Sequence, residues 1–92
     1  MSLSTISIIV TGKVQGVVYR QSTKEIATTA GITGTVENRE DGSVLIIATG
    51  TAEQLDKLIA WCRQGPSRAV VEKIEVLQIP LQHFKNFTID RK

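Results

Sequence analysis

The stretch GKVQGVVYR, residues 12–20, decides how the chain can fold. It follows the hydrophobic run of residues 6–10, whose alternating apolar positions predict a strand. Beyond the stretch, small and apolar residues recur at helical spacing as far as Gly31, which is well placed as a C-terminal cap. We therefore predict a strand, a glycine-containing loop and a helix over about residues 19–30.

The rest of the chain repeats strand and helix signals. The sequence EDGS, residues 40–43, separates two strand-like runs, and Asp-Gly in that position is a strong hairpin signal. Thr51 and Gln54 form a capping-box signature at the start of a second helix, which Gly65-Pro66 ends. The strands predicted after the first helix cover residues 35–39, 44–49, 70–79 and 84–89.

This order of elements predicts the fold class. Strand, helix, strand, strand, helix, strand is the βαββαβ pattern of an α+β, ferredoxin-like sandwich, with two helices on one face of an antiparallel sheet. A short extra C-terminal strand follows, and residues 1–92 suit a single domain. The expected core joins strand residues to helix residues, namely Val44, Ile46, Ile74 and Val76 to Ile26, Leu55, Leu58 and Ile59.

Composition and charge argue for a soluble protein without a nucleic-acid partner, and we expect a monomer, although the sequence does not indicate the oligomeric state. The net charge is only +2, and the basic residues are spread along the chain. No run approaches the roughly 18 to 20 apolar residues that span a membrane, and no secretory signal is recognised. The single cysteine, Cys62, falls on the apolar stripe of the second helix, so we expect it to be buried and unreactive. A lone cysteine fits a reducing compartment, and we expect a cytoplasmic location.

The glycine loop and Arg20 together suggest an anion site. Backbone N–H groups of a tight loop and of a first helical turn can point at one oxyanion, either a phosphate or a carboxylate. Arg20 would lie in that first turn, where a cation is unfavourable to the helix dipole unless an anion is bound beside it. The alternative is a surface arginine that lies over the edge of the sheet.

Asn38 is the second unusual residue. It lies two positions after Val36 in a predicted strand, so it shares the face of that residue, although strands disfavour asparagine. Its amide could bond to the neighbouring backbone, or it could orient a water molecule. The chain topology can bring Asn38 near the start of the first helix.

The absence of several sequence motifs excludes some classes of enzyme mechanism. The sequence has no Walker-type loop, no cysteine before a phosphate loop, no Asp-x-Asp pair and no histidine or cysteine cluster with metal-ligand spacing. An enzyme of this kind would work without a metal, a covalent intermediate or an obvious side-chain base. Hydrolysis of a carboxyl–phosphate anhydride suits such a site, because its carboxylate leaving group is weakly basic.

These residues resemble the acylphosphatase family. Its first signature is matched by Val10, Gly12, Val14, Gln15, Gly16, Val17, Tyr19 and Arg20, and its second by Gly34, Val36, Asn38, Gly42, Val44 and Gly50. The Gly65-Pro66 segment and the Phe87-x-Ile89 ending also fit, so the resemblance spans nearly the whole chain.

The resemblance implies the ferredoxin-like fold and the hydrolysis of acyl phosphates, a small-molecule substrate, without a cofactor. By this resemblance Arg20 would bind the phosphoryl oxygens and Asn38 would position the attacking water. The backbone N–H groups that would form the cradle belong to Gln15, Gly16, Val17, Val18 and Tyr19. The physiological acyl phosphate is not indicated by the sequence.

Three residues depart from the family pattern. Tyr19 replaces the usual phenylalanine, and its hydroxyl needs a partner. Thr35 stands in place of a large aromatic, so we expect looser packing beside the site. Glu37 stands where a basic residue is common, but neighbouring strand residues face opposite ways, so it should point away from the site. We expect reduced affinity or rate.

Two other functions share this pattern. The domain could bind a phosphate or carboxylate without turnover. An RNA-binding domain of the same topology would need aromatic residues on the sheet surface, whereas this chain has none in the third strand.

Overall fold

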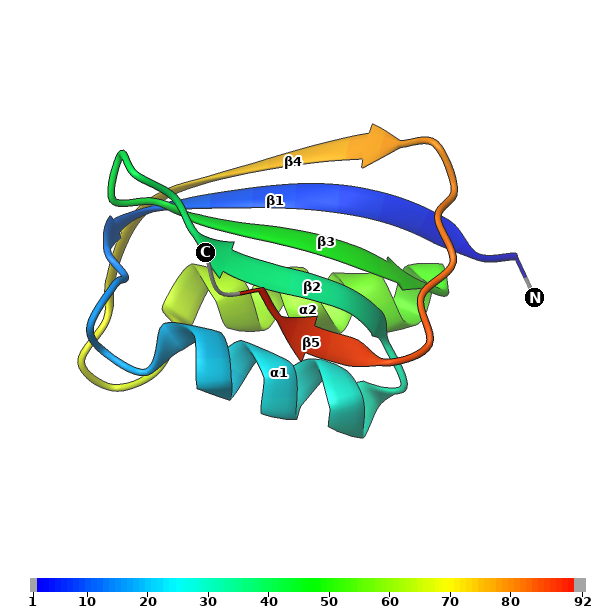
Figure 1. Cartoon of the computed structure of the whole chain (residues 1–92), viewed down its shortest axis with the longest axis horizontal. Helices are drawn as coiled ribbons and strands as arrows, with labels where there is room; N and C mark the ends of the chain where they lie inside the picture. Colours follow the sequence, from blue (N-terminus) through cyan, green and yellow to red (C-terminus); the bar gives the residue numbers. More distant parts are fainter. Residues whose placement is uncertain (1, 91–92) are drawn as a thin grey trace.

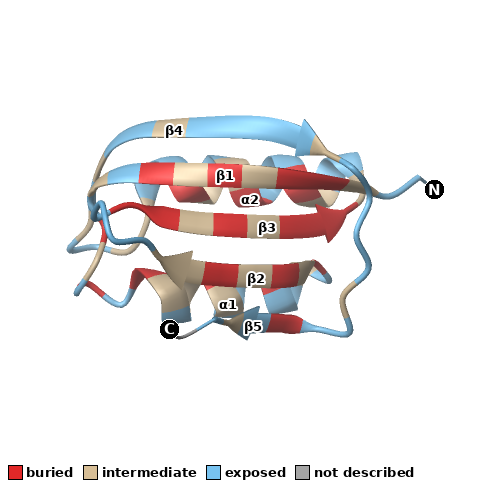
Figure 2. Ribbon diagram, turned by 45° about the horizontal axis from the view of Figure 1, so that its top comes forward, coloured by how far each residue is buried: buried red, intermediate tan, exposed pale blue. Residues whose placement is uncertain are grey.

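The computed structural model describes residues 2–90, in which two helices pack against one five-stranded sheet (Figure 1). Along the chain the elements are β1 (Ser4–Lys13), α1 (Tyr19–Ala30), β2 (Thr33–Asn38), β3 (Val44–Gly50), α2 (Ala52–Gln64), β4 (Val70–Ile79) and β5 (Phe87–Ile89). Both helices lie behind the sheet in Figure 2, so they cover the same face. The predicted α+β sandwich is confirmed.

The sheet has the strand order β4-β1-β3-β2-β5. The four strands of the predicted βαββαβ core pair antiparallel, whereas the short C-terminal strand β5 pairs parallel to β2. The direction of β5 follows from that of β4, because the connecting residues 80–86 cross one end of the sheet and start β5 at the end where β4 stops (Figure 1). The whole sheet is therefore mixed.

Two buried threonines hold this crossing segment in place. The hydroxyl oxygens of Thr5 on β1 and Thr49 on β3 lie 2.6 Å apart. The Gln82 amide donates to Thr5 Oγ1 at 2.9 Å, and Thr49 Oγ1 donates to the Gln82 carbonyl at 2.7 Å. These bonds satisfy two polar side chains inside the sheet, and they direct the chain toward β2. Strand β5 begins at Phe87, three residues later than the predicted Phe84.

The ends of both helices agree with their sequence signals. α1 runs over Tyr19–Ala30 as predicted, and Gly31 caps it in the left-handed conformation with φ 81°. At the start of α2, Thr51 Oγ1 accepts from the Gln54 amide and Gln54 Oε1 accepts from the Thr51 amide, which confirms the capping box. Gln54 Nε2 also donates to the Ala30 carbonyl at 2.9 Å, so the start of α2 is tied to the end of α1.

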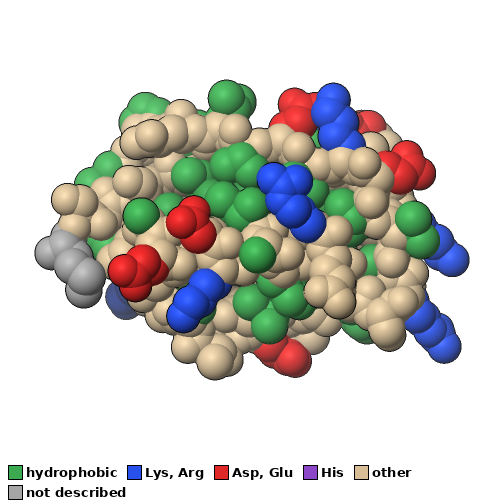
Figure 3. Space-filling view, turned by 180° about the vertical axis from the view of Figure 1, so that it is seen from behind, with side chains coloured by type: hydrophobic (Ala, Val, Ile, Leu, Met, Phe, Trp, Pro, Cys, Tyr) green, Lys and Arg blue, Asp and Glu red, His purple; other side chains and the backbone are tan. Residues whose placement is uncertain are grey.

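The core lies between the sheet and the helices, and the predicted Val44, Ile46, Leu55 and Leu58 are buried in it. Two predicted core residues are more exposed than expected. Ile26 is 37% exposed, because the buried face of α1 is centred on Tyr19, Thr23 and Ala27. Val76 is 38% exposed, since β4 is an edge strand. Hydrophobic side chains are also visible at the surface when the molecule is seen from behind (Figure 3). No helix in the described part of the chain is long and apolar enough to cross a membrane.

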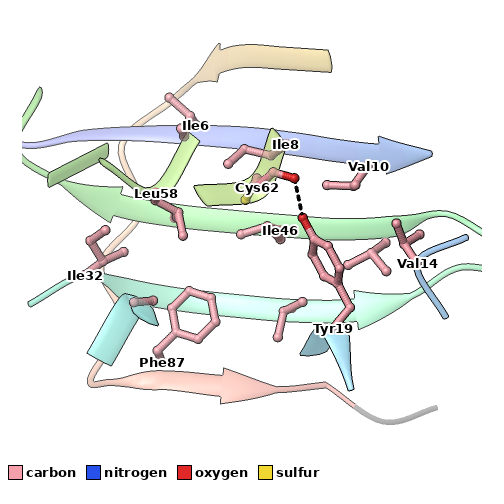
Figure 4. Packing of buried hydrophobic residues seen from close by; sticks show 14 of the residues in the cluster. Ile6, Ile8, Val10, Val14, Tyr19, Ile32, Ile46, Leu58, Cys62 and Phe87 are labelled. Atoms are coloured by element: carbon pink, nitrogen blue, oxygen red, sulfur yellow. Dashed lines mark hydrogen bonds between the residues drawn. The ribbon is translucent and has the colours of Figure 1, made fainter. Parts of the chain in front are cut away.

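Tyr19 joins the beginning of α1 to the end of α2. Its side chain is only 1% exposed, and its hydroxyl donates to the Cys62 carbonyl at 2.8 Å (Figure 4). That carbonyl lies in the last turn of α2, where its usual helical donor would be the amide of residue 66, which is proline and has no N–H. The tyrosine hydroxyl therefore supplies the donor that Pro66 lacks. The Tyr19 ring also packs on Trp61, with ring centroids 5.3 Å apart.

We predict that Tyr19→Phe lowers the free energy of unfolding by about 1 to 2 kcal/mol, because it leaves the buried Cys62 carbonyl without a donor. Urea unfolding followed by the fluorescence of Trp61, the only tryptophan, would measure the change. Equal stability of the two proteins would show that the carbonyl finds another partner.

We also predict that the protein loses stability as the solution becomes alkaline. Burial raises the pKa of the Cys62 thiol from 9.0 to about 12. Between these values the thiol ionises in the unfolded chain but stays protonated in the native one, so unfolding becomes more favourable as the pH rises. Between about pH 8 and about pH 10 the parent should lose roughly 1 kcal/mol more than a Cys62→Ser variant, as urea unfolding at each pH would measure. Parallel pH curves for the two proteins would contradict this prediction.

Candidate active site

A hollow of about 330 Å³ opens where β1 leads into α1. Arg20, the second residue of α1, and Asn38, the last residue of β2, both line it. The start of α1 and the end of β2 lie at the same end of the molecule (Figure 1). The structure therefore brings together the two predicted catalytic side chains, together with Val14, Gly16, Val18, Tyr19, Gln21 and Ile89.

The predicted cradle residues divide into two groups. Gly16, Val18 and Tyr19 line the hollow, whereas Gln15 and Val17 do not. The Gln15 side chain points to the β2–β3 hairpin, where its Nε2 donates to the Arg39 carbonyl at 2.8 Å and to the Ser43 carbonyl at 2.9 Å. Gln15 thus fastens the loop to the hairpin that follows Asn38, a role that the sequence analysis did not predict.

The hairpin is itself held by Asp41. Its Oδ1 accepts from the Ser43 amide at 2.9 Å and from the Ser43 hydroxyl at 2.5 Å, and these bonds lower the pKa of the Asp41 carboxyl. The turn is closed by the Arg39 amide, which donates to the Ser43 carbonyl at 2.8 Å. Because the Arg39 and Ser43 carbonyls also accept from Gln15, an ordered hairpin keeps the loop of residues 14–18 in place.

The loop amides are available to a ligand. Within the described residues, no hydrogen bond is formed by the backbone amides of residues 15–18. The N-cap of α1 is Val18, whose side chain cannot accept a hydrogen bond, so the first amides of the helix also lack a cap. Val18 has φ 57° and ψ 26°, a left-handed conformation that is strained for a β-branched residue and recurs at functional sites. The positive end of the helix dipole thus lies beside the hollow.

Arg20 adds a full positive charge at the same place. The residue is half-buried, and the only ion pair found among residues 2–90 joins Lys73 and Glu75 on β4. The Arg20 guanidinium therefore has no carboxylate partner in the described chain, although it lies at the positive end of a helix. An oxyanion in the hollow could accept from this guanidinium and from the loop amides together.

Asn38 supplies the complementary acceptor. Its Oδ1 is buried and has no hydrogen-bond partner among the described residues. The alternative that its carbonyl oxygen bonds the neighbouring backbone is therefore not observed. A buried amide oxygen needs a donor, and because Asn38 lines the hollow, a small rotation of its side chain would let a water molecule there provide one.

Of the three residues that depart from the family pattern, only Tyr19 lines the hollow. Tyr19 has found the partner that its hydroxyl needs, the Cys62 carbonyl. Thr35 and Glu37 alternate along β2 with Val36 and Asn38, and neither lines the hollow, in keeping with the expectation that Glu37 points away. Their effect on affinity or rate stays a prediction.

Comparison with known proteins connects this geometry to a family. The acylphosphatase family model matches residues 6–89. A curated acylphosphatase from Marinobacter nauticus is 44% identical over 88 residues, covering 95% of this chain and 96% of its own. The crystal structure of acylphosphatase from Bacillus subtilis superposes with a TM-score of 0.92 at 32% identity, covering 98% of this chain and 100% of its own. An acylphosphatase structure from Coxiella burnetii gives a TM-score of 0.93 at 31% identity, covering 96% and 93%. The chain therefore belongs to the acylphosphatase family.

Proposed function

We propose that this acylphosphatase hydrolyses the carboxyl–phosphate bond of acyl phosphates by direct attack of a water molecule, with Arg20 and Asn38 as its catalytic residues. One observation carries the proposal. Around a single hollow lie an arginine without an ion pair, loop amides without acceptors and a buried amide oxygen without a donor, all within the described part of the chain. These unsatisfied groups match the needs of a phosphoryl group and a water molecule.

The phosphoryl group would be held by charge and by hydrogen bonds. The guanidinium of Arg20 donates to its oxygens as a planar fork, and backbone amides donate from the loop. In this proposal the cradle comprises Gly16, Val18 and Tyr19, which line the hollow, and the adjoining Gln15 and Val17, which do not. These donors are already in place before substrate binds, because Gln15 and the buried Tyr19 fix the loop at both ends. Preorganised donors of this kind stabilise the charge on the equatorial oxygens in the transition state.

The attacking water would be oriented by Asn38. Once the side chain rotates toward the hollow, its Oδ1 accepts a hydrogen bond from the water and directs the water oxygen toward phosphorus. As the new P–O bond forms, the bond to the acyl oxygen breaks and its electron pair leaves with the carboxylate. The water proton passes to a phosphate oxygen or to solvent. A weakly basic leaving group needs no general acid, so positioning and electrostatics can supply most of the rate enhancement.

The proposed reaction uses no metal ion or cofactor. Among residues 2–90, no three His, Cys, Asp or Glu side chains are grouped so that they could hold a metal ion. The donors around the hollow are amides and a guanidinium, which bind an anion but not a cation. This donor set supports a metal-free mechanism.

We further propose that residues 1–92 act as one monomeric cytoplasmic domain that binds neither nucleic acid nor membranes. A buried free thiol at Cys62 fits a reducing compartment, which supports the location. The small net charge of +2 supports the lack of a nucleic-acid partner.

We predict that Arg20→Gln and Asn38→Ala each lower kcat for benzoyl phosphate by about 100-fold or more, the usual effect of removing one preorganised transition-state contact. Both variants should stay folded, because neither side chain has a hydrogen-bond partner in the described chain. Release of inorganic phosphate measures the activity, and circular dichroism checks the fold.

Matched controls for this experiment are Arg63→Gln and Asn86→Ala, two exposed positions that do not line the hollow. Both should keep the parent activity. No phosphate release by the parent protein above background would overturn the enzymatic proposal and leave a binding module.

We predict that inorganic phosphate competes with the substrate and raises the melting temperature, because it would occupy the phosphoryl site of the native state only. Arg20→Gln should abolish both effects, whereas Asn38→Ala should keep the thermal shift while losing turnover, since Asn38 holds the water and not the phosphate. Thermal unfolding with about 10 mM phosphate, compared with chloride at equal ionic strength, measures the shift. Loss of phosphate binding in Asn38→Ala would contradict this division of roles.

A further inference from the structure

A second hollow, of about 320 Å³, lies beside the first. Gly16 and Val18 line both hollows, so the loop of residues 14–18 forms the wall between them. Asn38 lines only the first, whereas Pro66, Ser67 and Arg68 line only the second. Figure 1 shows the β1–α1 loop and the α2–β4 loop side by side at this end of the molecule. The second hollow is therefore separated from Asn38 by the loop.

The second hollow combines apolar walls with one positive charge. Val17, Val18 and Pro66 supply the apolar surface, and Val18 is 69% exposed. Arg68 is exposed, and its guanidinium has no ion pair or hydrogen bond among residues 2–90. No acidic side chain lines this hollow. This lining suits a ligand with an apolar body and an anionic group, and the planar fork of an arginine binds a carboxylate well.

The in-line geometry of phosphoryl transfer predicts where the acyl group of the substrate lies. In phosphoryl transfer the attacking and the leaving oxygen lie roughly in line with phosphorus, on opposite sides of it. If Asn38 holds the attacking water, the leaving carboxylate and the rest of the acyl group must point away from Asn38. Gly16 has no side chain at the shared wall, and the space around its Cβ position is open, so an acyl group can pass over it.

We propose that the second hollow receives the acyl group and that Arg68 selects acyl phosphates whose acyl group carries a second carboxylate. This inference rests on the proposed function, because it takes the positions of the phosphoryl group and the water from it. Arg68 would contact the far end of the substrate equally in the ground state and in the transition state. Its contribution should therefore change KM and leave kcat nearly constant.

The test compares benzoyl phosphate with its 3- and 4-carboxy derivatives, because the three share the reacting group and differ in the distal carboxylate. We expect the parent protein to favour at least one carboxylated substrate by about fivefold in kcat/KM, the upper range for an exposed ion pair. Arg68→Gln should reduce this ratio to about one by raising the KM of the carboxylated substrate. A 4-carbamoyl derivative, which has similar size and no charge, should show no preference.

Arg63→Gln is the matched control, since it removes the same charge from an exposed position outside both hollows. It should leave the ratio unchanged. The inference is overturned if the parent hydrolyses benzoyl phosphate without preferring a carboxylated substrate, or if Arg63→Gln and Arg68→Gln lower the ratio equally. If the parent hydrolyses none of the substrates, the proposed function fails and this inference fails with it.

Discussion

The packing of the buried Tyr19 side chain against the end of α2, where its hydroxyl also donates to the Cys62 carbonyl, is the constraint on which the position of α1 and of the candidate site depends. Tyr19 is the first residue of α1, so anchoring its ring at the end of α2 determines where α1 begins. Gly65 is part of the same constraint, because a Cβ there would lie 2.8 Å from a carbon of the Tyr19 ring. Pro66 leaves the Cys62 carbonyl without its helical donor, and the Tyr19 hydroxyl supplies one. The Tyr19 ring occupies the space that Gly65 leaves open. Arg20 and the loop amides take their positions from this anchor.

The candidate site is made of groups that a stable core would not leave unsatisfied. The end of β2 presents a buried amide oxygen without a donor in the described chain, and the start of α1 presents amides without a side-chain cap beside an unpaired arginine. Each of these groups is unfavourable to the folded protein by itself. Firmly satisfied neighbours hold them in place, namely Gln15 on the hairpin carbonyls, Asp41 on Ser43 and Tyr19 on Cys62. Well-bonded neighbours thus hold the unsatisfied groups of the candidate site in fixed positions.

Local signals predicted the elements well, and contacts between distant residues account for what they missed. The glycines around α1 and the capping box of Thr51 and Gln54 mark helix ends by their own backbone chemistry. Arg20 and Asn38 were candidates because their residue types are unusual for their positions, and the structure places both around one hollow. The exposure of Ile26 and the parallel direction of β5 depend instead on how elements pack and cross, which periodicity does not encode. The bond between Gln15 and the hairpin joins residues 24 and 28 positions apart, and no local pattern indicates it.

The position of β1 between β3 and β4 has a consequence for how the chain folds. β1 comes first in the sequence, yet Thr5 pairs with Ile79, and its hydroxyl accepts from the amide of Gln82, a residue 77 positions later. During synthesis, the apolar β1 must therefore remain without its β4 neighbour until residues 70–79 have also left the ribosome. Such non-local pairing slows folding, because a long loop must close before the contacts form. The helices can form early, but the sheet that positions Asn38 is completed only after β4 and β5 have been synthesised.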